Sequence, residues 1–161
     1  MLITFLLTMG IISICVVIHY EALYRLGSFV EELRISPRQQ VVVGVLLALA
    51  AHVVEIYIFA GGYYYALYYG TIGGFTGEAP MENYFDCVYL SFVTYSTLGF
   101  GDIIPHGGVR FMVGVEAMVG LVQIAWTASY LFMQMEQKWG HSAVSGPVAS
   151  RKGSRRGNSR E

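Results

Sequence analysis

Residues 94–102 read Thr-Tyr-Ser-Thr-Leu-Gly-Phe-Gly-Asp, and this stretch decides how the rest of the chain is interpreted. It ends a short apolar run, residues 84–97, and precedes a long one, residues 111–133. Glycines alternate with larger side chains at Gly99 and Gly101. Because glycine accepts backbone conformations that residues with a Cβ resist, such a stretch can turn successive carbonyl groups toward one side. The other interpretation is a glycine-rich turn between two helices, which at membrane depth would need a buried setting or a polar lumen.

Composition predicts an integral membrane protein. Of the 161 residues, 55% are hydrophobic, 14% aromatic and only 13% charged, which excludes an ordinary soluble domain. A helix that crosses a bilayer needs ~20 mostly apolar residues. Residues 1–18, 41–60 and 111–133 approach or meet this length, whereas residues 84–97 suit a re-entrant helix. The first run could instead be a signal peptide, but it lacks a basic start and a clear cleavage site, so we favour a retained helix.

Basic residues predict the orientation, because Lys and Arg accumulate on the cytoplasmic side. Residues 20–40 contain three arginines and residues 138–161 contain six basic groups, whereas residues 61–85 contain none. We therefore expect a multi-pass protein of the cell (inner) membrane with its N-terminus outside and its C-terminus in the cytoplasm. The tail, residues 139–161, is typical of disorder. Its basic residues either contact anionic lipid or only set the orientation of the chain in the membrane. We expect no nucleic-acid partner.

The motif TLGFG at residues 97–101, followed by Asp102, resembles the selectivity filter of potassium channels. The resemblance is to small bacterial channels built from two transmembrane helices and a pore loop, and it covers about residues 84–138. It implies that backbone carbonyls and one threonine hydroxyl replace the water around a K⁺ ion. One chain supplies too few carbonyls, so a homotetramer with the filter on its fourfold axis is implied. The implied filter residues are Thr97, Leu98, Gly99, Phe100 and Gly101.

The same resemblance assigns supporting roles around the filter. Tyr89 stands where some relatives carry a tryptophan that bonds the aspartate, so we expect a Tyr89–Asp102 hydrogen bond. Glu116 lies inside the last span and either braces the filter, by bonding the pore helix or the Asp102 region, or is a protonated group bonded to a neighbouring helix. Gly120 matches the hinge of related inner helices. An apolar stripe after it would line the cavity or only pack against other helices: Leu121, Ile124, Ala128 and Phe132.

Ionisable residues in the first two spans permit another kind of site. His52 and Glu55 lie three residues apart and share a helix face, and His19 and Glu21 stand at the end of the first span. These groups could bind a metal or sense pH, or a His–Glu hydrogen bond could hold the helices together. We expect His19 near the cytoplasm and the other pair deeper, so no metal is assigned, with His52 and Glu55 as the remaining candidates.

We therefore predict an all-α membrane protein with three transmembrane helices, a re-entrant pore helix and a filter loop, assembling as a tetramer. The predicted segments are a first transmembrane helix (1–20), a cytoplasmic amphipathic loop (21–40), a pore domain (41–138) and a disordered basic tail (139–161). The pore domain divides into an outer helix (41–60), an outer loop (61–83), a pore helix (84–97), the filter (97–101) and an inner helix (110–138).

The predicted function is passive, potassium-selective conduction, without enzymatic activity and without a cofactor beyond the permeant K⁺ ions. Three alternatives stay open. They are a weakly selective cation channel, a non-conducting subunit of another channel, and a membrane protein with a His/Glu metal site.

Overall fold

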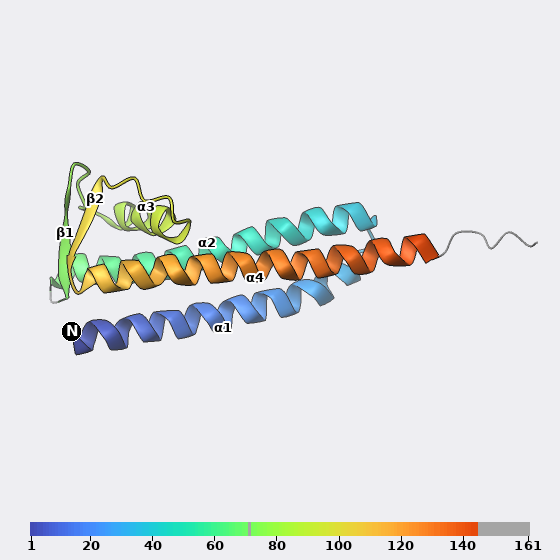
Figure 1. Ribbon diagram of the computed structural model, residues 1–161, viewed down its shortest axis with the longest axis horizontal. Helices are drawn as coiled ribbons and strands as arrows, with labels where there is room; N and C mark the ends of the chain where they lie inside the picture. The colour runs from blue at the N-terminus through green and yellow to red at the C-terminus, as the bar shows by residue number, and fades with distance from the viewer. Residues whose placement is uncertain (71, 145–161) are drawn as a thin grey trace, which may run out of the picture.

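The computed structural model describes residues 1–70 and 72–144, with side chains through residue 136, and it is mostly helical (Figure 1). Three long helices run alongside one another, and a short helix and a two-stranded antiparallel sheet lie toward the end that holds the N-terminus. The elements in chain order are α1 (Leu2–Glu32), α2 (Pro37–Tyr69), β1 (Gly73–Gly77), α3 (Tyr84–Tyr95), β2 (Ile103–Gly107) and α4 (Val109–Val144). Helices α1, α2 and α4 are each long and apolar enough to cross a membrane.

Local sequence signals set where α2 and α3 begin and where α2 ends. The Ser36 side chain accepts the N–H of Gln39 while Gln39 reaches back to the Ser36 N–H, and Pro37 occupies the first helical position. Helix α2 ends at Gly70, whose φ of 61° provides the left-handed cap. Asn83 caps α3 with a second capping box. The start of α3, and with it the position of the segment that follows, is therefore fixed by the sequence nearby.

The first helix extends beyond the end predicted at residue 20. Helix α1 continues to Glu32, so the predicted loop at 21–40 shrinks to a link of residues 33–36 between α1 and α2. The reason is an apolar stripe that keeps this segment helical: Leu26 and Val30 are buried together with Ala48 of α2 and pack beside Leu131 of α4. Residues 21–32 of the predicted amphipathic loop are therefore helical, with Leu26 and Val30 buried.

The other predicted boundaries shift by smaller amounts. Helix α2 begins before residue 41 and runs past residue 60, so residues 61–69 of the predicted outer loop are helical. Helix α3 ends at Tyr95, just before the predicted filter. Helix α4 runs to Val144, so the first part of the predicted disordered tail is also helical, whereas residues 145–161 lie outside the described residues.

The predicted all-α class needs one correction, because a small two-stranded antiparallel sheet joins the two sides of the pore loop. Gly73 of β1 lies opposite Gly107 of β2, and Gly77 lies opposite Ile103. The sequence does not predict these strands, since both are short, β1 is rich in glycine and β2 contains Pro105. The sheet closes a loop that begins at the end of α2 and carries α3 and residues 96–102.

The core lies between the long helices and the inner face of α3. Phe59 and Tyr63 of α2, Cys87 of α3 and Met112 of α4 are fully buried there, together with Cys15 of α1. Both cysteines are free. Because α3 shares this core with all three long helices, the segment that follows it is held in a fixed place relative to them.

Candidate functional site

The segment that follows α3 has an alternating backbone. Thr97, Gly99 and Gly101 have φ values of 59°, 48° and 81°, whereas Leu98 and Phe100 lie outside the positive-φ region. Alternation of left-handed and right-handed residues turns successive peptide groups toward the same side of the chain. For a β-branched residue such as Thr97 this conformation is unfavourable, and strained residues of this kind cost about 1–3 kcal/mol and persist only where their surroundings enforce them.

Two backbone hydrogen bonds hold the segment against the end of α3. The Thr97 N–H donates to the Thr94 carbonyl at 2.9 Å, and the Gly99 N–H donates to the Val93 carbonyl at 3.0 Å. A Cβ built on Gly99 would meet no atom within 4 Å, so the need for glycine there comes from its positive φ rather than from crowding within the chain. The side chains of Leu98 and Phe100, 58% and 66% exposed, contact little of their own chain.

Asp102 anchors the other end of the segment. Its carboxylate accepts a hydrogen bond from the Tyr89 hydroxyl at 2.7 Å, as the sequence predicts. Its backbone carbonyl accepts the N–H groups of Glu78 and Ala79 at 3.0 and 3.3 Å. The hydrogen bond to Asp102 raises the pKa of Tyr89, which keeps this phenol a donor. Residues 97–101 are therefore tethered to α3 at one end and to both α3 and the β1 side of the loop at the other.

Glu116 of α4 connects its own helix to α2 and α3 through buried hydrogen bonds. Its carboxylate is fully buried and accepts hydrogen bonds from Ser91 of α3, at 2.5 Å, and from Tyr63 of α2. Ser91 is also placed to donate to the Ile56 carbonyl at 2.8 Å. The contact with α3 is the one expected of a brace, and the contact with α2 is the one expected of a helix–helix bond. No hydrogen bond joins Glu116 to Asp102 within the described residues.

Gly120 lies where α4 crosses the end of α3. A Cβ at this position would come within 2.2 Å of the Tyr95 carbonyl oxygen. The absence of a side chain is therefore what allows the two helices to approach at this point. The resemblance assigns Gly120 a hinge, and the structure provides a packing reason for glycine here.

The stripe predicted to line a cavity lies on the face of α4 that points away from the core of its own chain. Leu121 and Phe132 are 60% and 65% exposed, Ile124 is 43% exposed, and Ala128 is exposed as well. The opposite face of α4 is buried and carries Glu116, Gln123 and Thr127. The two faces are thus cleanly separated, but the stripe's part in a pore stays a prediction.

A polar cluster lies beneath the end of α3, in the interior of the helix bundle. His19 Nδ1 lies 2.8 Å from one carboxylate oxygen of Glu55, and His52 Nδ1 lies 3.4 Å from the other. Tyr95 donates to that second oxygen, and its hydroxyl lies 2.8 Å from His52 Nδ1. Thr127 Oγ1 lies 3.2 Å from His19 Nε2 and 3.1 Å from His52 Nε2. His19 and Glu55 are fully buried, and His52 is 8% exposed.

The predicted difference in depth between His19 and the His52–Glu55 pair is wrong. Helices α1 and α2 are antiparallel and joined by a short link, and because α1 continues to Glu32, His19 lies well inside the bundle rather than at its edge. Glu21 does not join this cluster. It forms an exposed ion pair with Arg25 at 2.6 Å.

Sequence reasoning missed three members of the cluster. In the sequence, Tyr95 belongs to the apolar run before the filter, and Thr127 and Gln123 belong to a span; Gln123 Oε1 lies 3.0 Å from the Tyr95 hydroxyl. A signal was present, since Glu116, Gln123 and Thr127 are polar residues at helical spacing in an otherwise apolar segment. Such residues are costly in a membrane unless they find polar partners in neighbouring helices.

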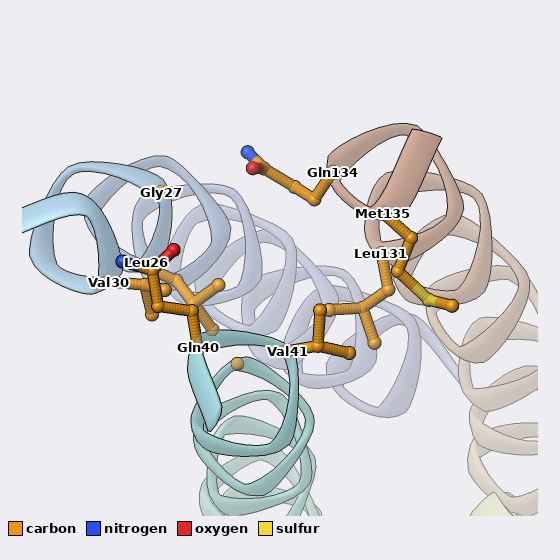
Figure 2. A pocket seen from close by; sticks show the side chains of 9 residues that line it. Leu26, Gly27, Val30, Gln40, Val41, Leu131, Gln134 and Met135 are labelled. Atoms are coloured by element: carbon orange, nitrogen blue, oxygen red, sulfur yellow. The ribbon is translucent and has the colours of Figure 1, made fainter. Parts of the chain in front are cut away.

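Two hollows adjoin these elements. Figure 2 shows the smaller, a cavity of about 20 Å³ at the far end of the bundle, where Leu26 and Gln40 face Leu131 and Gln134. It has room for about one water molecule and for no larger ligand. The larger is an apolar groove of about 600 Å³ between α2, the end of α3 and α4, and three members of the polar cluster line it: His52, Tyr95 and Thr127.

The fold and the site together define a multi-pass membrane protein in which a short helix presents a strained, carbonyl-rich loop between two long helices. Residues 51–137 match the family model Ion_trans_2, described as an ion channel. The match covers more than half of the chain, which therefore belongs to this ion channel family. Its members are channels rather than enzymes. Comparison with curated proteins and with solved structures produced no match.

Proposed function

We propose that this protein is a potassium-selective channel that conducts passively as a homotetramer, with residues 97–101 as its selectivity filter. The observation that carries the proposal is the alternating backbone of Thr97, Gly99 and Gly101. A filter needs closely spaced carbonyl oxygens that replace the hydration shell of the ion. A strained threonine between two hydrogen-bonded anchors is difficult to explain in an ordinary turn, but it is expected where carbonyls must point one way.

The apolar surface around the segment supports assembly. Leu98 and Phe100 are more than half exposed, as are Met118, Leu121 and Val122 on α4. Lipid could cover part of this surface, but the segment's backbone polar groups need water, protein or ions at membrane depth. Four copies around one axis would turn the carbonyls toward a shared pathway and cover Leu98 and Phe100 with neighbouring chains.

The orientation follows from the fold together with the basic residues. The N-terminus and the β1–β2 sheet lie toward one end of the bundle, and the α1–α2 link lies at the other (Figure 1). Arg34 lies in that link, and Arg38 lies in the first turn of α2. We propose that this end faces the cytoplasm and that the filter opens to the outside of the cell membrane. In this orientation α3 is the pore helix, α2 and α4 are the outer and inner helices, and α1 is an additional peripheral helix.

Two other channel functions share this architecture. A weakly selective cation channel would have the same helices with fewer or looser ion sites, and the positive φ of both Gly99 and Gly101 favours the selective filter over it. A non-conducting subunit would have the same fold but would need another chain. Flux measurements separate these functions, because they differ in what passes rather than in how the chain folds.

The test is ion flux into liposomes that contain the purified protein and hold a K⁺ or a Na⁺ gradient. The informative variant is Gly99→Ala, since an L-residue in the left-handed region costs about 1–2 kcal/mol. In a tetramer this cost applies in every chain. The matched control is Gly10→Ala, a helical glycine with no atom within 4 Å of the added Cβ and with an ordinary φ.

We expect K⁺ flux to exceed Na⁺ flux in wild type and in Gly10→Ala, and to be lost in Gly99→Ala. Equal K⁺ and Na⁺ flux would support the weakly selective channel instead. A stable tetramer without flux would support the silent subunit, and a protein that stays monomeric would contradict the proposal as a whole.

A further inference from the structure

The polar cluster of His19, His52, Glu55 and Tyr95 is not used by the proposed conduction pathway. It is buried inside one chain, whereas the pathway lies between chains. We propose that this cluster is a binding site for a divalent transition-metal ion such as Zn²⁺, with His19 Nδ1, His52 Nδ1 and the Glu55 carboxylate as ligands.

The ligand atoms already converge. The three side chains offer ligand atoms that all lie within 4.8 Å of one another. A tetrahedral zinc ion bonded at ~2.0–2.1 Å holds its ligand atoms roughly 3.3 Å apart. His52 Nδ1 lies 3.4 Å from Oε2 of Glu55, which fits this value if that oxygen is the ligand. His19 Nδ1 lies 2.8 Å from the other oxygen, Oε1, so His19 would have to shift its contact from Oε1 to the ion. The Tyr95 hydroxyl, 2.8 Å from His52 Nδ1, is placed for the fourth position.

The protons of the cluster do not suffice for its contacts. Five contacts of 3.2 Å or less join these groups and Thr127, and each needs one proton: His19–Glu55, His52–Tyr95, Tyr95–Glu55, and Thr127 to each imidazole. A sixth contact, between the Tyr95 hydroxyl and the Gln123 amide, has a proton of its own when that amide donates. With neutral histidines, the two imidazoles, the phenol and the Thr127 hydroxyl supply only four. A buried carboxylate without a Lys or Arg among its hydrogen-bonding partners also needs a positive charge. The cluster is therefore one proton short, and an extra proton or a metal ion would supply the missing positive charge.

A metal ion supplies that charge and takes up the lone pairs of both Nδ1 atoms. If it binds both Nδ1 atoms, both Nε2 atoms carry a hydrogen, and the single oxygen of Thr127 can accept both, at 3.2 and 3.1 Å. Histidine ligands usually donate their second ring N–H in this way, which fixes the ring and its tautomer. An extra proton placed on His19 would also satisfy all five contacts, so the count by itself calls for a cation and not for a metal in particular. The fact that both rings turn the same nitrogen toward Glu55 favours the metal.

The groove of about 600 Å³ provides a route into the site, because His52, Tyr95 and Thr127 line it. Bound metal would join α1 to α2 and would fix Tyr95, which stands two residues before Thr97. The ion would thus hold the inner end of the proposed filter in place without itself being conducted.

The experiment measures metal bound to the full-length protein, purified with an affinity tag that contains no histidine, treated with a chelator and then incubated with Zn²⁺. After removal of free metal, we expect one zinc per chain by elemental analysis. Co²⁺ in its place should give the visible absorption bands of a tetrahedral site. These readouts need no ion flux, so they test the metal site whether or not the protein conducts ions.

Variants assign the metal to the cluster. His52→Ala and Glu55→Gln should each lower zinc affinity at least tenfold, and Thr127→Val should weaken it by about 10–100-fold through the ligands it supports. The control is His106→Ala, an exposed histidine on β2. Less than a tenth of an equivalent of metal in wild type, or equal metal in all variants, would overturn the proposal and leave a hydrogen-bonded network that holds an extra proton. The wild-type measurement decides this even if a variant fails to fold.

Discussion

Gly120→Ala tests the close approach of α4 to α3, on which the position of the proposed filter depends. The added Cβ would lie 2.2 Å from the Tyr95 carbonyl oxygen and 3.0 Å from both the carbonyl carbon and the first ring carbon of that residue. Ordinary contacts between such atoms are about 3.5 Å. Backbone therefore has to move by more than ~1 Å, in an interior that is packed as densely as a crystal.

The expected cost can be bounded. Overpacking of a core typically costs about 1–3 kcal/mol, while alanine is favoured over glycine within a helix by up to about 1 kcal/mol. Because the atom that is struck is backbone rather than a flexible side chain, we expect the upper part of the range and a net destabilisation of about 1–2 kcal/mol for each chain. The control is Gly114→Ala on the same helix, where a Cβ meets nothing within 4 Å. That variant should be as stable as wild type or more stable.

The assay is the thermal unfolding midpoint of the purified protein in detergent, with both variants and wild type measured side by side. We expect Gly120→Ala to melt at a lower temperature than wild type and Gly114→Ala to melt at the same temperature or higher. If the two variants melt together, α4 does not approach Tyr95 as closely as described. In that case glycine at 120 would be explained by the hinge that the resemblance implies rather than by packing.

Substitutions at two further positions test the supports of the proposed filter. Tyr89→Phe removes the hydrogen bond to Asp102 and should reduce K⁺ flux in liposomes, though less than Gly99→Ala does; unchanged flux would mean that this anchor is dispensable. Glu116→Ala deprives the Ser91 and Tyr63 hydroxyls of a buried acceptor and should lower the free energy of unfolding by about 2–4 kcal/mol, whereas Glu116→Gln, which keeps one acceptor oxygen, should lower it by about 1 kcal/mol. Denaturant unfolding compares the two variants, and equal losses would contradict the account of Glu116 as a shared acceptor.

The features that could be predicted from the sequence are those fixed by local constraints. A bilayer demands long apolar helices, and the three candidate spans are present as helices for that reason. The Tyr89–Asp102 hydrogen bond could be predicted from the resemblance to potassium channels, some of which carry a tryptophan at the position of Tyr89. The alternating glycines indicated an unusual backbone, and the structure adds a positive φ at Thr97 that no residue preference would predict.

The features that could not be predicted depend on how distant segments meet. The segment after residue 20 loses its uninterrupted hydropathy, yet it stays helical because Leu26 and Val30 pack against two other helices. The wrong end assigned to α1 then placed His19 at the wrong depth and hid its contact with Glu55. The sheet was missed because its strands have little intrinsic preference for a β conformation.

The central claim is that residues 97–101 form a potassium-selective pathway. Its most direct test is the reversal potential of the purified protein in a planar bilayer, with K⁺ varied on one side and Na⁺ replacing it at constant total salt. We expect a reversal potential that follows the K⁺ equilibrium potential over the whole series. A reversal potential that stays near zero as Na⁺ replaces K⁺ would contradict it.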